Sequence, residues 1–136
     1  MKKSVLILCT GNSARSQMAE GLLRNMAGDR FEVFSAGTHP TSLNPNAVSA
    51  LAELGIDISF HRSKSADEFR NNSFDYVITV CDNARESCPI FPGAGERIHQ
   101  SFPDPAAAPI SDQPVIFRQV RDSIRTWLEL FIAQHS

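Results

Sequence analysis

The part of the sequence best suited to chemistry is CTGNSARS, residues 9–16, in which Cys9 precedes Arg15 by six positions. An ionised thiol is a nucleophile, and a guanidinium can hold two oxygens of a tetrahedral oxyanion at once. The apolar run at residues 5–8 predicts a buried strand before Cys9, and a helix is expected from Ser16. A loop between such a strand and helix presents backbone N–H groups to anions. We therefore expect an oxyanion-binding loop made of Thr10, Gly11, Asn12, Ser13, Ala14, Arg15 and Ser16, with Cys9 at its rim.

The residue types of this loop lead to three more specific expectations. Gly11 permits backbone angles that turn successive N–H groups inward. The start of the following helix should lower the pKa of Cys9 and favour its thiolate. Ser16 has two interpretations, because its hydroxyl could hydrogen-bond the thiolate or cap the helix.

A carboxylic acid that could serve this loop is Asp104, in the stretch FPDPAAA. Nucleophilic displacement at phosphorus or arsenic needs a proton for the departing oxygen, and a loop carboxyl can provide it. Pro103 and Pro105 restrict the backbone on both sides of Asp104. An Asp-Pro pair alone is usually an ordinary turn. In a chain that also carries Cys9 and Arg15, we interpret Asp104 as a general acid.

Two further thiols, Cys81 and Cys88, follow a predicted buried strand at residues 74–80. Cys81 comes directly after that strand, as Cys9 does after the first one. The carboxyl ends of parallel strands share one edge of a sheet, so contact between Cys9 and Cys81 is geometrically plausible. The alternative is that Cys81 is an inert strand-end residue and Cys88 a chance loop thiol.

The elements that must position these groups alternate along the chain. Short apolar runs predict strands at residues 5–8, 31–34 and 74–80 and around Ile98. Helical spacing of apolar residues predicts helices at 16–28, at 45–54 and from about 111–114 onward. Strands that alternate with helices predict an α/β fold with a parallel sheet and right-handed crossovers.

Composition limits the remaining possibilities. A length of 136 residues fits one domain, 1–136, and a net charge of −2 gives no global attraction to nucleic acid or to a membrane surface. No apolar run approaches the roughly 18 residues of a membrane span, and the first one is too short for a secretory segment, so we expect a cytoplasmic protein. The four histidines are scattered and no C-x2-C pair occurs, which predicts no metal site.

Four motifs together resemble the low-molecular-weight tyrosine phosphatase superfamily over nearly the whole chain: CTGNSARS at 9–16, SAGTHP at 35–40, LGIDIS at 54–59 and DPA at 104–106. The resemblance implies a single-domain three-layer sandwich with a four-stranded parallel sheet flanked by helices. It also implies that Cys9 is the nucleophile, Arg15 the oxyanion clamp and Asp104 the general acid.

Cys81 and Cys88 make the chain similar to the thioredoxin-coupled arsenate reductases of that superfamily. Three thiols allow a relay in which Cys9 binds the oxyanion, Cys81 attacks Cys9 and releases the reduced product, and Cys88 attacks Cys81. The resemblance implies arsenate as substrate, phosphate and sulfate as competing oxyanions, and arsenite as product. It further implies electrons from thioredoxin, no bound cofactor, and a monomer.

Two other functions compete with this one. A tyrosine phosphatase would use Cys9, Arg15 and Asp104 alone, but alanines follow Asp-Pro where an aromatic residue would stack on a phenol ring. An oxyanion or redox sensor could use the same loop and thiols, but the sequence has no basic patch for DNA.

One position departs from the family pattern. Several of these reductases hold a potassium ion beside the loop with an Asn, a Glu, a Ser and an Asp. Asn12, Glu20 and Ser35 match the first three, and Lys64 stands at the position of the Asp. The ammonium of Lys64 could pair with Glu20 in place of the ion. The alternative is a lysine that points into solvent.

Overall fold

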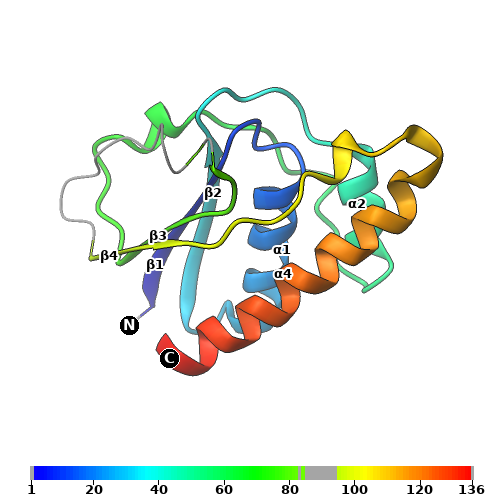
Figure 1. Ribbon diagram of the computed structural model, residues 1–136. Coiled ribbons are helices and arrows are strands. Elements are labelled where there is room, and N and C mark those ends of the chain that lie inside the picture. Colours follow the sequence, from blue (N-terminus) through cyan, green and yellow to red (C-terminus); the bar gives the residue numbers. More distant parts are fainter. Residues whose placement is uncertain (1, 83, 85–94, 136) are drawn as a thin grey trace.

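The computed structural model of the chain describes residues 2–82, 84 and 95–135. Four strands form one parallel sheet (Figure 1): β1 (Lys3–Cys9), β2 (Phe31–Gly37), β3 (Tyr76–Thr79) and β4 (Glu96–His99). Their spatial order is β2-β1-β3-β4, so β1 lies between β2 and β3. The register pairs Cys9 with Gly37 and Leu8 with Thr79. The carboxyl end of β1 is therefore enclosed by the ends of two neighbouring strands.

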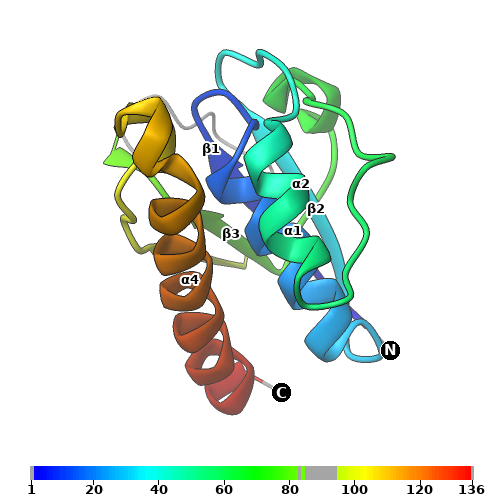
Figure 2. The same ribbon diagram turned by 90° about the vertical axis from the view of Figure 1, so that its right-hand side faces the viewer.

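The α-helices of the described chain lie on one face of this sheet. They are α1 (Arg15–Ala27), α2 (Pro45–Ala52) and α4 (Gln113–His135), which pack against one another and lie side by side in Figure 2. Three short 3-10 helices are also described: η1 (Ala66–Phe69) between α2 and β3, and η2 (Pro105–Ala107) and η3 (Ile110–Asp112) between β4 and α4. The expected α/β fold with a four-stranded parallel sheet is confirmed.

Side-chain alternation along the strands divides the core between two faces. On the face that the helices cover, the rings of Phe31 and Tyr76 pack against Phe131 of α4, with centroids 5.5 and 5.3 Å apart. On the opposite face, Phe34 packs against Phe69 and Phe74 at 5.6 and 5.9 Å. The central strand is buried on both faces, which explains its unbroken apolar run.

Element ends follow local chemistry. Asn44 caps α2 by accepting a hydrogen bond from the backbone of Asn46, and Pro45 occupies the first turn. Gly55 follows α2 with a φ of +77°, a conformation that suits glycine. Its N–H bonds the carbonyl of Ala52 at 2.9 Å. The helix therefore ends at Ala52, two residues before the predicted end at Leu54, and Gly55 completes the turn that follows it.

Candidate active site

The loop between β1 and α1 lies at the carboxyl edge of the sheet and is held from one side by the chain after β2. Backbone N–H groups of residues 38–44 donate to the carbonyls of Cys9, Thr10, Gly11 and Ser13 at 2.8–3.1 Å. The C=O and N–H of one peptide unit point in opposite directions. The N–H groups of the loop are therefore directed away from residues 38–44, where they are available to an anion.

The sharpest turn of the loop falls on Asn12. This residue has a φ of 48° and is fully buried. Gly11, which was expected to make the turn, does not have a positive φ. Asparagine adopts the left-handed region more readily than most residues. Its side-chain amide also donates to the hydroxyls of Ser16 and Ser35 at 2.8 and 2.9 Å, and its oxygen accepts from the backbone N–H of Lys64 at 2.9 Å. Asn12 thus joins the loop to α1, to β2 and to the segment before η1.

The contact with β2 is close because of Gly37. A Cβ added at Gly37 would lie 2.5 Å from the carbonyl oxygen of Thr10 and 2.9 Å from the backbone nitrogen of Asn12. A glycine is therefore needed for the loop to approach the strand this closely.

The sulfur atoms of Cys9 and Cys81 meet at the rim of this loop. Both thiols are free and buried, and they are hydrogen-bonded to each other. That hydrogen bond lowers the pKa of Cys81 to about 5, with help from the hydroxyl of Thr10 and the N–H of Ala84. It also raises the pKa of Cys9, and burial acts in the same direction. The pKa of Cys9 is therefore raised in this arrangement, contrary to the lowering expected from the following helix, and the thiolate is favoured on Cys81.

Arg15, at the end of the loop, lies close to Asp104. One guanidinium nitrogen of Arg15 donates to the carbonyl of Phe102 at 3.1 Å, and the other lies 3.9 Å from a carboxylate oxygen of Asp104. Asp104 also accepts a hydrogen bond from the backbone of Ala106 and so caps η2. Its side chain is 47 % exposed. The fold therefore brings Cys9, Cys81, Arg15 and the loop of Asp104 together, while Cys88 lies outside the described residues.

Glu20 is the centre of a buried charge cluster behind the loop. Its carboxylate accepts hydrogen bonds from Ser35 at 2.5 Å and Arg24 at 2.7 Å, and it lies 3.8 Å from the ammonium of Lys64 and 3.6 Å from the ring of His61. The Lys64 side chain is only 15 % exposed, and burial lowers its pKa. Lys64 therefore does not point into solvent.

One residue of this network, Gln17, was not expected. It is fully buried and donates to both oxygens of Asn12 and to the carbonyl of Arg62. The expected loop residue Ser16 accepts a hydrogen bond from Asn12 through its hydroxyl, and α1 begins after Ala14 without a side-chain cap. A glutamine on the buried side of α1 is the only sequence signal for such a network, because glutamine is seldom buried without partners.

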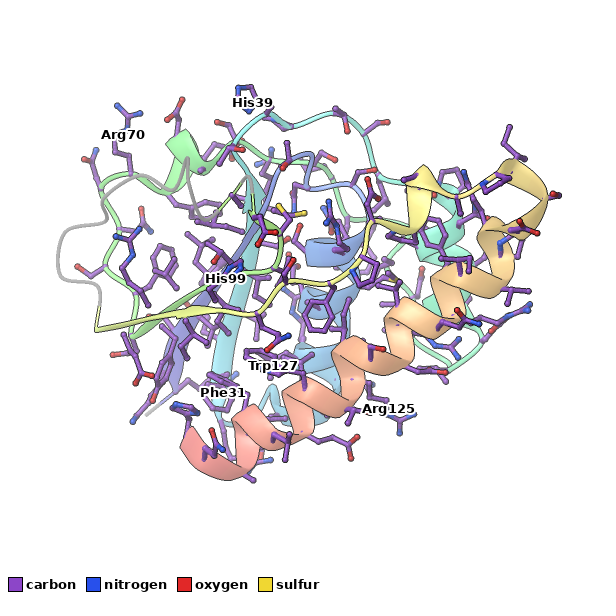
Figure 3. All side chains as sticks on the ribbon, viewed as in Figure 1. Phe31, His39, Arg70, His99, Arg125 and Trp127 are labelled. Atoms are coloured by element: carbon purple, nitrogen blue, oxygen red, sulfur yellow. The ribbon has the colours of Figure 1, made fainter. Side chains whose placement is uncertain are left out.

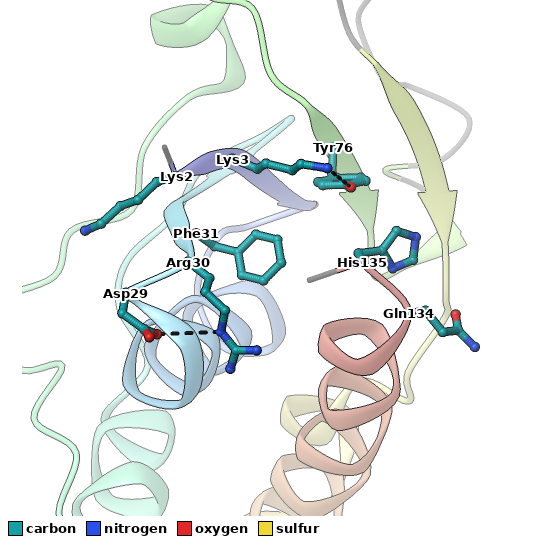
Figure 4. Close-up of a pocket in the computed structure, with 8 residues that line it drawn as sticks. All are labelled: Lys2, Lys3, Asp29, Arg30, Phe31, Tyr76, Gln134 and His135. Carbon is teal, nitrogen blue, oxygen red and sulfur yellow. Dashed lines mark hydrogen bonds and ion pairs between the residues drawn. The ribbon is translucent and has the colours of Figure 1, made fainter.

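A cavity of about 680 Å³ lies at the amino edge of the sheet, opposite to the loop between β1 and α1 (Figure 4). Its lining residues are Lys2, Lys3, Asp29, Arg30, Phe31, Tyr76, Gln134 and His135. Lys3 donates to the hydroxyl of Tyr76 at 3.4 Å. None of the candidate catalytic residues lines it, so we assign the chemistry to the carboxyl edge.

Within the described ranges, no helix is both long and apolar enough to span a membrane. In the same residues, no group of three or more His, Cys, Asp or Glu side chains is arranged to hold a metal ion.

Comparison with known proteins agrees with the fold and the loop. Residues 4–135 match the family described as low molecular weight phosphotyrosine protein phosphatase. The chain belongs to this family. Within it, the arsenate reductase 2 of Staphylococcus haemolyticus is 44 % identical over 130 residues, or 96 % of each chain. The arsenate reductase of Halalkalibacterium halodurans is 45 % identical over 132 residues, or 96 % of this chain and 95 % of the relative.

A solved structure has the same fold. It is described as an arsenate reductase in the oxidized state and superimposes with a TM-score of 0.84 at 30 % identity, covering 98 % of this chain and 99 % of that one. The family and the fold are thus established.

Proposed function

We propose that the chain reduces arsenate to arsenite with electrons from its own thiols. The observation that carries this proposal is the contact between the sulfurs of Cys9 and Cys81 beside the oxyanion loop. A hydrolase of this family needs one nucleophilic sulfur, whereas a reductase needs a second one within reach of the first. The two relatives at 44 and 45 % identity are both arsenate reductases by name, which supports the same activity here.

In the first step, the Cys9 proton passes to Cys81 along their hydrogen bond as the Cys9 sulfur attacks arsenic. An arsenic–oxygen bond breaks, and Asp104 gives the departing oxygen a proton so that it leaves as water. Arg15 and the loop N–H groups hold the remaining oxygens of the arsenic(V) adduct on Cys9. Arg15 already lies beside Asp104, at 3.9 Å, so the clamp and the acid are close to one another before substrate binds.

In the second step, Cys81 returns its proton to solvent and its thiolate attacks the Cys9 sulfur. The sulfur–arsenic bond breaks, its electron pair stays on arsenic, and arsenite containing arsenic(III) leaves. The thiols are oxidised to a Cys9–Cys81 disulfide. Cys88 then attacks Cys81, which frees Cys9 and leaves a Cys81–Cys88 disulfide for an external dithiol to reduce by two electrons.

We expect that dithiol to be thioredoxin, in the cytoplasm, with the chain acting as a monomer and without a bound cofactor. Phosphate and sulfate have the same tetrahedral shape as arsenate, so they should compete for the loop.

Asn12, Glu20, Ser35 and Lys64 support the loop in this proposal. The carboxylate of Glu20 already faces the cations of Arg24 and Lys64, and Asn12 already bonds Ser35. A potassium ion does not fit this set, because an ion bound there would be repelled by the ammonium of Lys64.

The test is arsenite formation from arsenate in the presence of thioredoxin, thioredoxin reductase and NADPH, beside hydrolysis of p-nitrophenyl phosphate. Cys9→Ser should abolish both reactions, because both need the nucleophile. Cys81→Ser and Cys88→Ser should abolish arsenite formation and leave ester hydrolysis. The ester hydrolysis that remains would show that both variants are folded.

Other outcomes would point elsewhere. Ester hydrolysis without arsenite formation by the unmodified protein would favour the phosphatase. Oxyanion binding without either reaction would favour a sensor. Full turnover by Cys88→Ser would contradict the relay.

A further inference from the structure

A histidine outside the loop bonds the residues on both sides of Cys81. His99, at the carboxyl end of β4 and labelled in Figure 3, is paired in register with Thr79. Its Nδ1 lies 2.7 Å from the hydroxyl of Thr79, and its Nε2 lies 3.0 Å from a carboxylate oxygen of Asp82. Thr79 comes two residues before Cys81 and Asp82 directly after it.

The order of the strands shows on which side of β3 each of these contacts lies. β3 lies between β1 and β4, so the chain leaving β3 has one neighbour on each side. The sulfur of Cys81 reaches toward the β1 side, where it contacts Cys9 and lies 3.3 Å from the hydroxyl of Thr10. The carboxylate of Asp82 reaches toward the β4 side, to His99. The side chains of Cys81 and Asp82 therefore extend in opposite directions across the end of β3.

Among the described residues, backbone hydrogen bonds from the chain after β4 reach the chain after β3 only as far as Val80. These bonds run from Gln100 to the carbonyl of Thr79 at 2.9 Å and from Phe102 to the carbonyl of Val80 at 3.0 Å. Beyond Val80, the contact of Asp82 with His99 continues the attachment through side chains.

Both ring nitrogens of His99 are used in this arrangement. A carboxylate only accepts hydrogen bonds, so Nε2 must carry a proton for Asp82. In the neutral ring, Nδ1 then accepts from the Thr79 hydroxyl. The hydrogen bonds link Thr79, His99 and Asp82 in series, and Thr79, at one end of the series, is buried with 6 % of its surface exposed. The other end, Asp82, is 75 % exposed and depends on His99 for its position.

We propose that His99 is a positioning residue that directs the sulfur of Cys81 toward Cys9 by fixing Thr79 on one side and Asp82 on the other. It touches neither substrate nor the reacting atoms. This role rests on the proposed function, because it matters only if Cys81 attacks Cys9. Loss of the contact leaves the oxyanion loop intact but lets the Cys81–Asp82 turn rotate.

The test is a single turnover of the full chain, with reduced protein mixed with increasing arsenate and no reductant, and arsenite release followed in time. His99→Ala and Asp82→Ala should each lower the rate constant at saturating arsenate at least about tenfold, because a displacement of about 1 Å at reacting atoms has effects of that size. The arsenate concentration at half-saturation should stay within about twofold. The double variant should lose about as much as the larger single loss, since both changes break one contact.

Glu96→Gln serves as the control, because it changes the exposed first residue of β4, which lies 3.7 Å from His135, and should leave the rate unchanged. The test variant Asp82→Ala alters an exposed side chain, so it keeps the proposal testable if His99→Ala fails to fold.

A wild-type rate constant in His99→Ala or Asp82→Ala would overturn the proposal, as would losses that multiply in the double variant. A change in half-saturation alone would also overturn it. Failure of the proposed function is recognised separately, by unchanged arsenite release from Cys81→Ser.

Discussion

At the residue scale, the hydrogen bond between the two sulfurs shifts their pKa values in opposite directions. The pKa of Cys81 is lowered chiefly by the hydrogen bond from Cys9, so Cys9→Ala should raise it above its value of about 5. Ultraviolet thiolate absorbance of a Cys88→Ser background, titrated with and without Cys9→Ala, measures the change. Absorbance lost at the same pH in both proteins would contradict this effect of the hydrogen bond.

The same shift links pH to stability. The folded pKa of Cys81 lies below its unfolded value, so ionisation of this thiol stabilises the fold at pH values above the unfolded pKa. That contribution should be lost as the pH falls through about 5. Urea unfolding at pH values from the unfolded pKa of a thiol down to about 5 should show a steeper decline in the free energy of unfolding for the parent than for Cys81→Ser.

Lys64 offers a third prediction at this scale. Lys64→Asp would remove the ammonium 3.8 Å from Glu20 and add a second carboxylate. We expect the free energy of unfolding to fall by about 1–3 kcal/mol, and potassium to restore part of it by bridging the two acids. Melting in potassium and in sodium at equal ionic strength measures both effects.

The matched control is Lys2→Asp, which makes the same charge change at an exposed residue on the opposite edge of the sheet. It should respond equally to both salts, and so should the parent. A potassium-dependent rise in the melting temperature of the parent would show that Lys64 does not stand in for the ion.

At the scale of elements, the site depends on how closely the loop packs on β2. Gly37→Ala would place a Cβ 2.5 Å from the carbonyl oxygen of Thr10 and so displace the loop. We expect arsenite formation to fall at least about tenfold, with weaker phosphate competition, because the oxyanion donors move. Steady-state kinetics with phosphate as inhibitor measures both.

Gly55→Ala is the control, since a Cβ there meets nothing within 4 Å. Its φ of +77° makes the change cost about 1–2 kcal/mol of stability without touching the loop. Equal kinetic losses in the two variants would argue against the packing explanation.

These elements also mark what the sequence could and could not predict. The strands and helices follow from apolar periodicity, and the meeting of Cys9 with Cys81 follows from parallel strands sharing an edge. The turn at Asn12 and the network around Gln17 depend on contacts between distant loops, which leave no periodic signal. For the same reason, the spacing of Asp82 and His99 in the sequence did not predict their contact.

At the scale of the whole molecule, an aromatic cluster and the candidate active site lie at opposite edges of the sheet. The ring of Phe131 packs with Phe31, Tyr76 and Trp127 near the cavity at the amino edge. Phe131→Ala should lower the free energy of unfolding by about 3–5 kcal/mol, as large core deletions do. Urea unfolding measures this, and half-saturation by arsenate should be unchanged in the fraction that remains folded.

The neighbouring Leu130 is 58 % exposed, so Leu130→Ala should change the free energy of unfolding by less than about 0.5 kcal/mol. A Phe131→Ala loss no larger than that of Leu130→Ala would show that the aromatic cluster contributes little.

The position of β1 between β2 and β3 has a consequence for how the protein is made. Thr10 and Cys81 are 71 residues apart in the chain and meet only when β3 joins β1. Closing so long a segment is slow compared with forming local structure. During synthesis, the amino-terminal thiol therefore leaves the ribosome well before its partner exists. In the proposed relay, a nascent chain would have a nucleophile without a resolving thiol, and the redox reaction would become available only once β3 has joined β1.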